Sequence, residues 1–343
     1  MRALFLPQTA ESGPSSRYRV YQLLPMLRQM GIDCEVSPGI DAALYDDIYL
    51  RHTRSKANAF RAIWQRRRAD LKRATDFDVI IVQKGFFPGL YAGLELQLAR
   101  RRPLVFDFDD AIWLPRQGGN PLLRYLHRER EVQKIIQCAA AIFAGNEYLA
   151  EYASRFNRNV TIVPTALDLS RYQQSPESAT VGWIGSSSTM PYLKPLRPVF
   201  ETLGIKPRVI AAGDPSTLEF PVEFRQWKLE TEMAELSQIG IGLAPLPDNA
   251  WERGKCGVKL LQYMACGIPA IASPVGVHNQ IVRDGVNGFL VRTPEEWIAR
   301  LRPLHSDAQL RTSLGTEARK LVEDRYSLAV VAGQVALVLR SCR

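Results

Sequence analysis

The chain lacks the features of a secreted or membrane-spanning protein. Its five cysteines have irregular spacing and form no Cys-x-x-Cys pair, which argues against a disulfide framework and a zinc site and favours a reducing compartment. No run of 18 apolar residues occurs, so we expect no membrane-spanning helix. The opening residues, MRALFLPQTA, have too short an apolar stretch for a signal peptide and predict a first strand instead.

Several catalytic arrangements are also missing. The sequence contains no Gly-x-Ser-x-Gly turn and no Ser-His-Asp order, which argues against a hydrolase of the catalytic-triad type. Only four histidines are present, and none of them is at metal-ligand spacing from another. We also find no internal repeat and no low-complexity tract, so a solenoid is not expected.

Positive charge is concentrated in the first half of the chain. Residues 1–165 hold 24 Lys and Arg against 17 Asp and Glu, a net charge of +7, and the rest holds 20 against 18, a net charge of +2. The excess predicts an anionic surface or acceptor as a partner of the first half. A basic surface without a partner is the alternative.

Strand-like and helical segments alternate along the whole chain. With 343 residues, of which 46% are hydrophobic and 23% charged, the composition is typical of a globular protein of two domains. The alternation predicts α/β domains with parallel sheets, here two Rossmann-like domains. The expected strands lie in residues 2–7, 34–38, 78–83, 103–108, 140–145, 160–165, 179–185, 208–213, 239–246, 269–274 and 288–291.

A polar stretch with two prolines, residues 164–178, marks the expected boundary between the domains. We therefore expect an N-terminal domain over 1–165 and a C-terminal domain over 166–323. The amphipathic segment 324–343 predicts a final helix that packs back on the N-terminal domain. Ligands of parallel α/β sheets bind beyond the carboxyl ends of the strands, so we expect these edges to face each other across a cleft.

The segment VGWIGSSSTMPYL (181–193) ends a strand in small residues before a helix. Small residues let backbone N–H groups approach a phosphate, which makes Gly185, Ser186 and Ser187 candidate phosphate ligands. The loop is neither a Walker A nor a Gly-x-Gly-x-x-Gly motif. A small-residue turn capped by serine is the alternative.

The segment RGKCGVKLLQYMACGIPAIAS (253–273) predicts a turn, a short helix and a strand. Lys255 and Lys259 are expected one helical turn apart at the front of this helix, where the helix dipole disfavours cations unless an anion is present. Together with Cys256 and Gly257 of the turn they form a candidate diphosphate site, and Gln262 is a candidate ribose ligand. Two solvated lysines and a surface glutamine are the alternative.

The run KLLQYMACGIPAIASPVGVHNQIVRDGVNGFLV resembles the donor-binding region of family 4 glycosyltransferases. The resemblance extends to VGWIGS (181–186) and AIFAGNEYLAEYA (141–153), is strong over 239–292 and is weaker before 140. It implies a GT-B enzyme that uses a nucleotide-diphosphate sugar and retains the anomeric configuration. A subgroup with the pattern Lys-Cys-x-x-Lys-Leu-Leu-Gln-Tyr fits best, which implies that Lys255 and Lys259 bind the diphosphate.

The sequence also departs from the family pattern. Many members carry two glutamates eight residues apart, at the positions of Gly254 and Gln262 here, and Glu252 is out of register with the first. The resemblance implies a UDP- or GDP-sugar as donor substrate, with neither a metal nor a separate cofactor. A non-catalytic GT-B-like binding or scaffold protein is the alternative that the missing glutamate favours.

The segment VFDFDDAIW (105–113) ends a strand in three carboxylates, Asp107, Asp109 and Asp110. Such a cluster is costly unless hydrogen bonds, a metal or substrate hydroxyl groups satisfy it. The resemblance places this loop at the sugar and acceptor, which makes Asp109 and Asp110 the candidate catalytic residues. A metal site on these two residues and a helix-capping role are the alternatives.

The segment SGPSSRYRVYQLL (12–24) forms the first strand-to-helix loop, and Pro14 suits the start of the helix. The family carries a glycine-rich loop here that contacts the acceptor or a phosphate, which makes Gly13, Ser16 and Arg17 candidate ligands. A solvated arginine is the alternative for Arg17.

The segment 51–73 carries nine Lys or Arg residues and one Asp, with Phe60, Ile63 and Trp64 among them. A basic amphipathic segment with tryptophan is typical of a peripheral helix on an anionic membrane. A nucleic-acid-binding segment and a solvated basic helix with Trp64 packed inward are the alternatives.

These inferences together predict a retaining glycosyltransferase that transfers a sugar to a hydroxyl of a glycan or lipid-linked acceptor and does not bind nucleic acid. Polysaccharide biosynthesis in a bacterium is the role that the resemblance and the charge suggest. We expect a cytoplasmic protein, either free or peripheral on the cytoplasmic face of the inner membrane.

Overall fold

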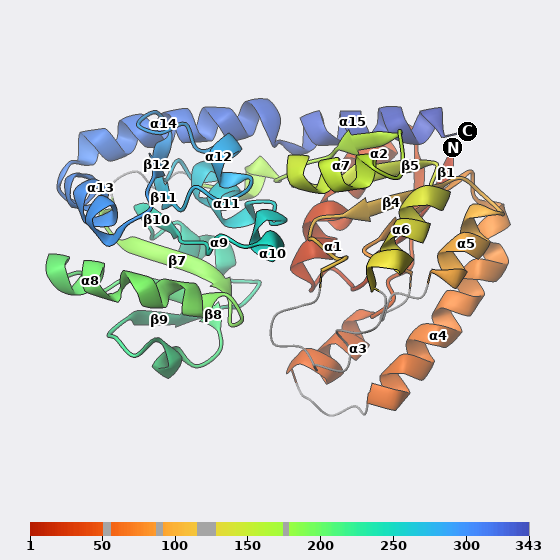
Figure 1. The fold of residues 1–343 in the computed structure, drawn as a ribbon, viewed down its shortest axis with the longest axis horizontal. Coiled ribbons are helices and arrows are strands. Elements are labelled where there is room, and N and C mark those ends of the chain that lie inside the picture. Colours follow the sequence, from red (N-terminus) through yellow and green to blue (C-terminus); the bar gives the residue numbers. More distant parts are fainter. Residues whose placement is uncertain (51–55, 87–91, 115–127, 174–177, 343) are drawn as a thin grey trace. The chain divides into compact units, whose positions relative to one another are not determined.

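The computed structural model describes residues 1–50, 56–86, 92–114, 128–173 and 178–342, and the chain forms two compact units (Figure 1). Unit 1 comprises Met1–Ala166, Gly254–Cys256 and Leu328–Arg343. Unit 2 comprises Leu167–Arg253 and Gly257–Ser327. Each unit is therefore assembled from segments that are not continuous in the sequence.

Unit 1 is built on a parallel six-stranded sheet with the strand order β2-β1-β3-β4-β5-β6. Every residue of β3 and β4 is buried, which explains their nearly continuous apolar sequences, because strands of a parallel sheet are covered on both faces. The strands are β1 (Arg2–Leu6), β2 (Asp33–Val36), β3 (Val79–Gln83), β4 (Leu104–Phe108), β5 (Ala141–Ala144) and β6 (Val160–Ile162).

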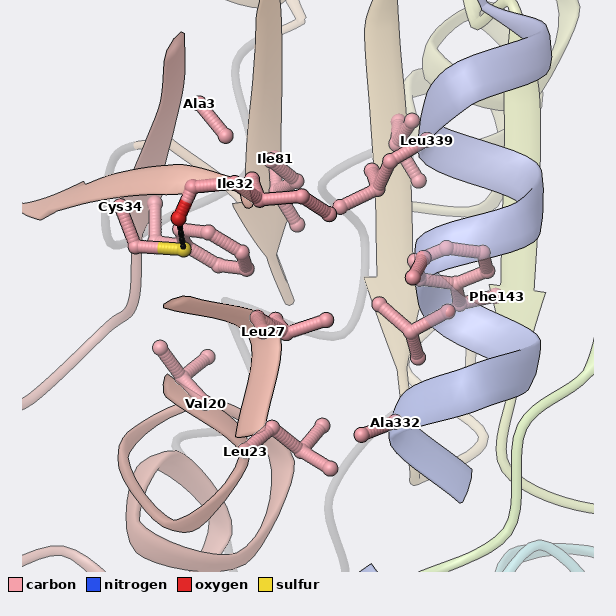
Figure 2. Packing of buried hydrophobic residues seen from close by; sticks show 14 of the residues in the cluster. Ala3, Val20, Leu23, Leu27, Ile32, Cys34, Ile81, Phe143, Ala332 and Leu339 are labelled. Carbon is pink, nitrogen blue, oxygen red and sulfur yellow. Dashed lines mark hydrogen bonds between the residues drawn. The ribbon is translucent and has the colours of Figure 1, made fainter. Parts of the chain in front are cut away.

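Helices cover the sheet of unit 1. On one face α2 and α15 form a core with the sheet, in which Leu339 and Ala332 of α15 lie near Phe143 and Leu27 (Figure 2). Helices α5 and α6 contact β4, and α4 contacts α5. The helices are α1 (Pro14–Arg19), α2 (Leu24–Gln29), α3 (Ala42–Tyr45), α4 (Lys56–Arg73), α5 (Gly93–Ala99), α6 (Arg128–Cys138), α7 (Glu147–Ser154) and α15 (Leu328–Ser341).

Unit 2 is built on a second parallel six-stranded sheet, with the order β12-β11-β10-β7-β8-β9. Its strands are β7 (Val181–Ser186), β8 (Arg208–Ala212), β9 (Glu223–Gln226), β10 (Ile241–Ala244), β11 (Ala270–Ala272) and β12 (Gly288–Leu290). Its helices are α8 (Arg197–Leu203), α9 (Glu232–Leu236), α10 (Ala250–Arg253), α11 (Val258–Ala265), α12 (His278–Ile281), α13 (Pro294–Ser306) and α14 (Ala308–Arg325). Both units are thus Rossmann-like α/β layers.

Each expected strand corresponds to an observed one, and among the strands of the described residues only β9 was not predicted. This strand, with the sequence EFRQ, lies at the edge of the sheet and is half exposed. It pairs with β8 through backbone hydrogen bonds, and the Glu223 side chain is ion-paired with Arg208. An edge strand held in this way needs no apolar run, so periodicity could not reveal it.

Within the described part of the chain, no helix combines the length and the apolar character needed to cross a membrane.

Candidate functional site

The loops that follow β1, β3 and β4 meet at the carboxyl edge of the sheet of unit 1. Because the three strands are parallel neighbours, their carboxyl ends lie at the same edge, where α/β sheets bind ligands. The first loop leads into α1, the second begins at Lys84, and the third carries Asp109 and Asp110. The sequence predicted the two aspartates but not the lysine.

Lys84 joins the two aspartates. Its Nζ lies 2.8 Å from Asp109 Oδ1 and is also ion-paired with Asp110. The backbone of Lys84 has φ +59°, a left-handed conformation that is uncommon for a residue with a side chain. The backbone of Lys84 is therefore locally strained, and this conformation directs the ammonium group toward the two aspartates.

Lys255 adds a second cation, at 3.0 Å from Asp110 Oδ1 to its Nζ. Its backbone is held in unit 1 by Asn146, whose Nδ2 donates to the Gly254 carbonyl at 3.1 Å and to the Lys255 carbonyl at 2.9 Å. A Cβ on Gly145 would lie 2.3 Å from Cys256 Sγ, so only glycine permits this close approach. The segment Gly254–Cys256 is thereby fixed against the loop of the aspartates.

The charges of this group stabilise one another. Burial alone would raise the pKa of Asp110, but Lys84 and Lys255 outweigh it and lower that pKa to about 2. Burial would lower the pKa of Lys84, yet Asp109 and Asp110 raise it above its ordinary value. At neutral pH Lys84 is therefore protonated and Asp110 ionised.

Asp107, the first carboxylate of the predicted cluster, has a different role. It is 3% exposed and ion-paired with Arg19 of α1, whose Nε donates to Asp107 Oδ2 at 3.3 Å. Burial raises the pKa of Asp107 in spite of this partner. The Arg19–Asp107 pair thus ties α1 to the end of β4 and does not belong to the exposed edge.

The start of α1 reaches Asp109 through hydroxyl groups. Ser15 Oγ donates to Asp109 at 2.7 Å, and Gln83 Nε2 donates to Ser15 Oγ at 2.8 Å. The predicted ligand Ser16 donates to Gln83 Oε1 at 3.0 Å and is 1% exposed. Ser16 therefore orients Gln83 and, through it, Ser15, and no local pattern of residues predicts this chain of hydrogen bonds.

The other predicted residues of this loop are Gly13 and Arg17. Gly13 precedes α1 as its N-cap, and Pro14 is the first helical residue, as the sequence predicted. Arg17 is 3% exposed, with its guanidinium 5.0 Å from the centre of the Tyr18 ring. The alternative of a solvated Arg17 is therefore wrong.

In unit 2, the loop after β7 lies beside the first turn of α11. Lys259 Nζ is 3.2 Å from Thr189 Oγ1 and 4.1 Å from the centre of the Trp183 ring. Of the predicted phosphate ligands, Gly185 and Ser186 end β7 and Ser187 follows it, exposed. Lys259 and this loop thus lie together at the carboxyl edge of the second sheet.

Lys255 lies in the turn that precedes α11, and Lys259 lies in the first turn of this helix, which follows Cys256 as expected. Helix α11 begins at Val258, and Gly257 precedes it with φ +69°, so the helical path cannot extend back to Lys255. Lys255 and Cys256 belong to unit 1, whereas Gly257 and Lys259 belong to unit 2. Cys256 is buried, its thiol donates to the Asp109 carbonyl at 3.3 Å, and burial raises the pKa of that thiol.

Gln262 is 5% exposed, so the alternative of a surface glutamine is wrong. Its Nε2 donates to Glu232 Oε1 at 2.9 Å, and Trp227 Nε1 donates to Glu232 Oε2 at 2.8 Å. The carboxylate beside Gln262 is thus supplied by α9, which is distant in the sequence. Glu252, out of register with the family pattern, instead accepts a hydrogen bond of 2.6 Å from Tyr192.

In the described residues, no group of three or more His, Cys, Asp or Glu side chains has the arrangement of a metal site. Lysines, rather than further ligands, surround Asp109 and Asp110.

Known proteins resemble this chain locally in sequence and throughout in structure. Residues 200–307, which include Lys259 and Gln262, match the family model for glycosyl transferases group 1. A segment of 66 residues is 38% identical to the putative glycosyltransferase EpsD of Bacillus subtilis and covers 19% of this chain and 17% of EpsD. The match to this curated relative thus spans about one sixth of its length.

Several solved structures align with nearly the whole chain, and two of them are HepE and a sucrose-phosphate synthase. HepE of Anabaena, solved in complex with UDP, superposes with a TM-score of 0.71 at 16% identity over 99% of this chain and 100% of HepE. Sucrose-phosphate synthase of Thermosynechococcus elongatus superposes with a TM-score of 0.76 at 15% identity, over 99% of this chain and 98% of the synthase.

The chain has the GT-B fold. The GT-B assignment accounts for both parallel sheets, and it agrees with the fold that the sequence predicted.

Proposed function

We propose that the protein is a retaining glycosyltransferase that transfers a sugar from a nucleotide-diphosphate sugar to a hydroxyl of a glycan or lipid-linked acceptor. The observation that carries the proposal is the match of residues 200–307 to glycosyl transferases group 1, because it includes the helix that begins beside Lys259. The GT-B fold supports it.

In this proposal the donor binds at the carboxyl edge of the sheet of unit 2. The N-terminal turn of α11, Lys259 and the loop from Gly185 to Ser187 bind the diphosphate, because free N–H groups and a cation both favour an anion there. Gln262 and the buried Glu232 beside it bind the ribose. HepE was solved with UDP and with UDP-glucose, which makes UDP the first nucleotide to test and GDP the second.

The residues of unit 1 act on the sugar and the acceptor. Asp109 and Asp110, fixed by Ser15, Lys84 and Lys255, accept hydrogen bonds from hydroxyl groups and stabilise positive charge on the sugar. The acceptor oxygen bonds to the anomeric carbon as the bond to the diphosphate oxygen breaks, and that diphosphate oxygen takes the acceptor proton. Lys255 and Lys259 stabilise the negative charge of the leaving diphosphate in this proposal, and Cys256 and Gly257 position the two lysines.

Nucleotide binding tests the donor site. We expect calorimetric titration to give saturable binding of UDP or GDP to the wild type, and Lys259→Ala to weaken it by about tenfold, the value of one charge-assisted contact. Lys206→Ala, which removes an exposed lysine of the same unit, is the matched control and should bind as the wild type does. Failure of both nucleotides to bind, or equal binding by the Lys259 variant, would contradict the donor site.

Donor hydrolysis separates the enzyme from the alternative of a scaffold protein. A transferase should slowly release the sugar from the bound donor without an acceptor, and the double variant Lys255→Ala, Lys259→Ala should not. A wild type that binds the nucleotide but never cleaves the donor would favour the scaffold.

We further propose that α4 contacts an anionic membrane surface. Phe60 is 54% exposed and Trp64 38% exposed, whereas Ile63 is buried, so the alternative with Trp64 packed inward is wrong. Ile63 lies on the buried face of the helix, about 100° around the axis from Trp64. Exposed Arg61 and Arg68 lie about one helical turn before and after Trp64, an arrangement suited to anionic lipids. Residues 51–55 of the predicted segment lie outside the described residues.

Vesicle sedimentation tests this surface. The protein should bind phosphatidylglycerol vesicles and not phosphatidylcholine vesicles. The double variant Phe60→Ser, Trp64→Ser should bind several-fold more weakly, because it lacks the two apolar rings that insert into the membrane interface. Equal sedimentation of the wild type and the double variant would exclude α4 as the contact.

A further inference from the structure

A cavity of 860 Å³ lies in unit 1 at the amino ends of β4, β5 and β6. Its lining residues Pro103, Ala140 and Asn159 each directly precede or adjoin the first residue of one of these strands. Asp109 and Asp110 follow the other end of β4, a strand of five residues that spans roughly 16 Å. The cavity is therefore separate from the proposed catalytic edge.

Four arginines line this cavity, and the lining residues that the structure describes include no carboxylate. Arg100, Arg101 and Arg102 come from the turn between α5 and β4, and Arg158 comes from the turn between α7 and β6. Asn159 and Thr161 add polar groups. Two turns that are distant in the sequence thus bring positive charge to one place.

Two of the arginines are positioned by backbone carbonyls. Arg102 donates to the Phe77 and Thr75 carbonyls, both at 2.7 Å, and Arg101 donates to the Leu71 carbonyl at 2.6 Å. These bonds fix the guanidinium groups but leave their charge uncompensated. None of the four is ion-paired with a carboxylate of the described residues, and Arg100 and Arg158 are exposed and also make no hydrogen bond through their side chains there.

We propose that this cavity is a second anion site, which binds a ligand that carries phosphate groups. Guanidinium groups match phosphate oxygens with paired hydrogen bonds, and several of them at one opening favour an ion with more than one phosphate. No aromatic side chain is among the described lining residues, so none is available there to stack on a nucleotide base. We therefore expect the site to recognise the phosphate groups themselves. The ligand is either a soluble polyphosphate or the headgroup of an anionic lipid. The inference is independent of the proposed function.

Titration with pyrophosphate on the full chain tests the site. We expect Arg100→Gln with Arg158→Gln to weaken pyrophosphate binding by about tenfold or more, because two charge-assisted contacts are lost. The matched control is Lys206→Gln with Arg302→Gln, which removes the same charge from exposed positions of unit 2 and should leave binding unchanged. Neither pair lies on α11 or on the loop after β7, so the difference between the variants reports on the cavity alone.

Vesicles distinguish the two sources of phosphate. Both variants also carry Phe60→Ser and Trp64→Ser in this test, so that α4 does not mediate vesicle binding. If phosphatidylglycerol vesicles then bind the control variant and fail to bind the arginine variant, the ligand is a lipid headgroup. If both variants sediment alike and only pyrophosphate distinguishes them, the ligand is soluble. Identical behaviour of the two variants towards both probes would overturn the proposal. Arg158→Gln alone, in an exposed turn, provides a folded variant should the pair disturb the structure, and it should show part of the loss.

Discussion

At the scale of single residues, the unit 1 site depends on Lys84. Asp109 and Asp110 follow an apolar strand directly, which is why the sequence could predict them. Lys84 follows β3 in the same way, in DVIIVQK, so the rule that found the aspartates would also have found the lysine. What the sequence could not provide is the pairing, because β3 and β4 become neighbours only in the sheet.

Lys84→Met should reduce sugar transfer on the order of 100-fold, because the two aspartates lose the cation that orients them. Methionine keeps the length of the side chain and leaves the left-handed backbone position as it is. The measurement is turnover with a donor and an acceptor, with thermal unfolding to confirm the fold. Transfer at the wild-type rate would remove Lys84 from the site.

The same variant should change how stability depends on pH. The pKa of Asp110 is lowered from 3.8 to about 2, so its ion pairs stabilise the fold above pH 4 and this contribution is lost as the pH falls through 2. Without Lys84 the pKa of Asp110 rises and this contribution, at most about 2 kcal/mol, shrinks. Denaturant unfolding should therefore show a difference between wild type and variant that is large at pH 7 and small near pH 2. A difference independent of pH would contradict this linkage.

At the scale of elements, α11 shows how a glycine defines the start of a helix. Gly257 has φ +69°, and a Cβ there would lie 2.6 Å from Ile281 Cδ1. The sequence predicted the helix and its buried leucines correctly, because apolar spacing is a local property. It did not indicate the left-handed conformation of Gly257 in the turn before the helix, because a positive φ at glycine cannot be inferred from periodicity.

Gly257→Ala should destabilise unit 2 more than Gly204→Ala does. Both glycines have positive φ, so each substitution costs about 1–2 kcal/mol of backbone strain. Gly204 has no other atom within 4 Å of its Cβ position, so only Gly257→Ala adds a clash, worth about 1–3 kcal/mol. Equal shifts of the denaturant midpoint would show that the Ile281 contact relaxes without cost.

At the scale of the whole molecule, the chain returns to unit 1 after completing unit 2. Helix α15 contributes Val331, Val335 and Leu339 to the same core as Phe5 of β1. The sequence predicted that the final helix packs on the N-terminal domain, and α15 lies beside α2 (Figure 1). The stability of unit 1 therefore depends on residues more than 300 positions away from its first strand.

Leu339→Ala should destabilise unit 1 by about 2–5 kcal/mol, because a fully buried side chain leaves a cavity in the core. Leu337→Ala is the matched control on the same helix, and as this side chain is 71% exposed the change should stay within about 0.5 kcal/mol. Denaturant unfolding measures both. Similar values for the two variants would show that α15 does not contribute to the core.

From the sequence alone follow the α/β class, every strand of the described residues except β9, and the aspartates at the carboxyl end of β4, because burial on both faces imposes apolar runs and ligand-binding residues follow such runs. The partners of these residues emerge from the folded chain: Lys84 lies with Asp109 and Asp110, Glu232 with Gln262, and Arg158 with the arginines before β4. Each of these groups joins loops or helices that are distant in the chain. Their proximity follows from strand order and helix packing, which depend on contacts across the whole unit and leave no local pattern in the sequence.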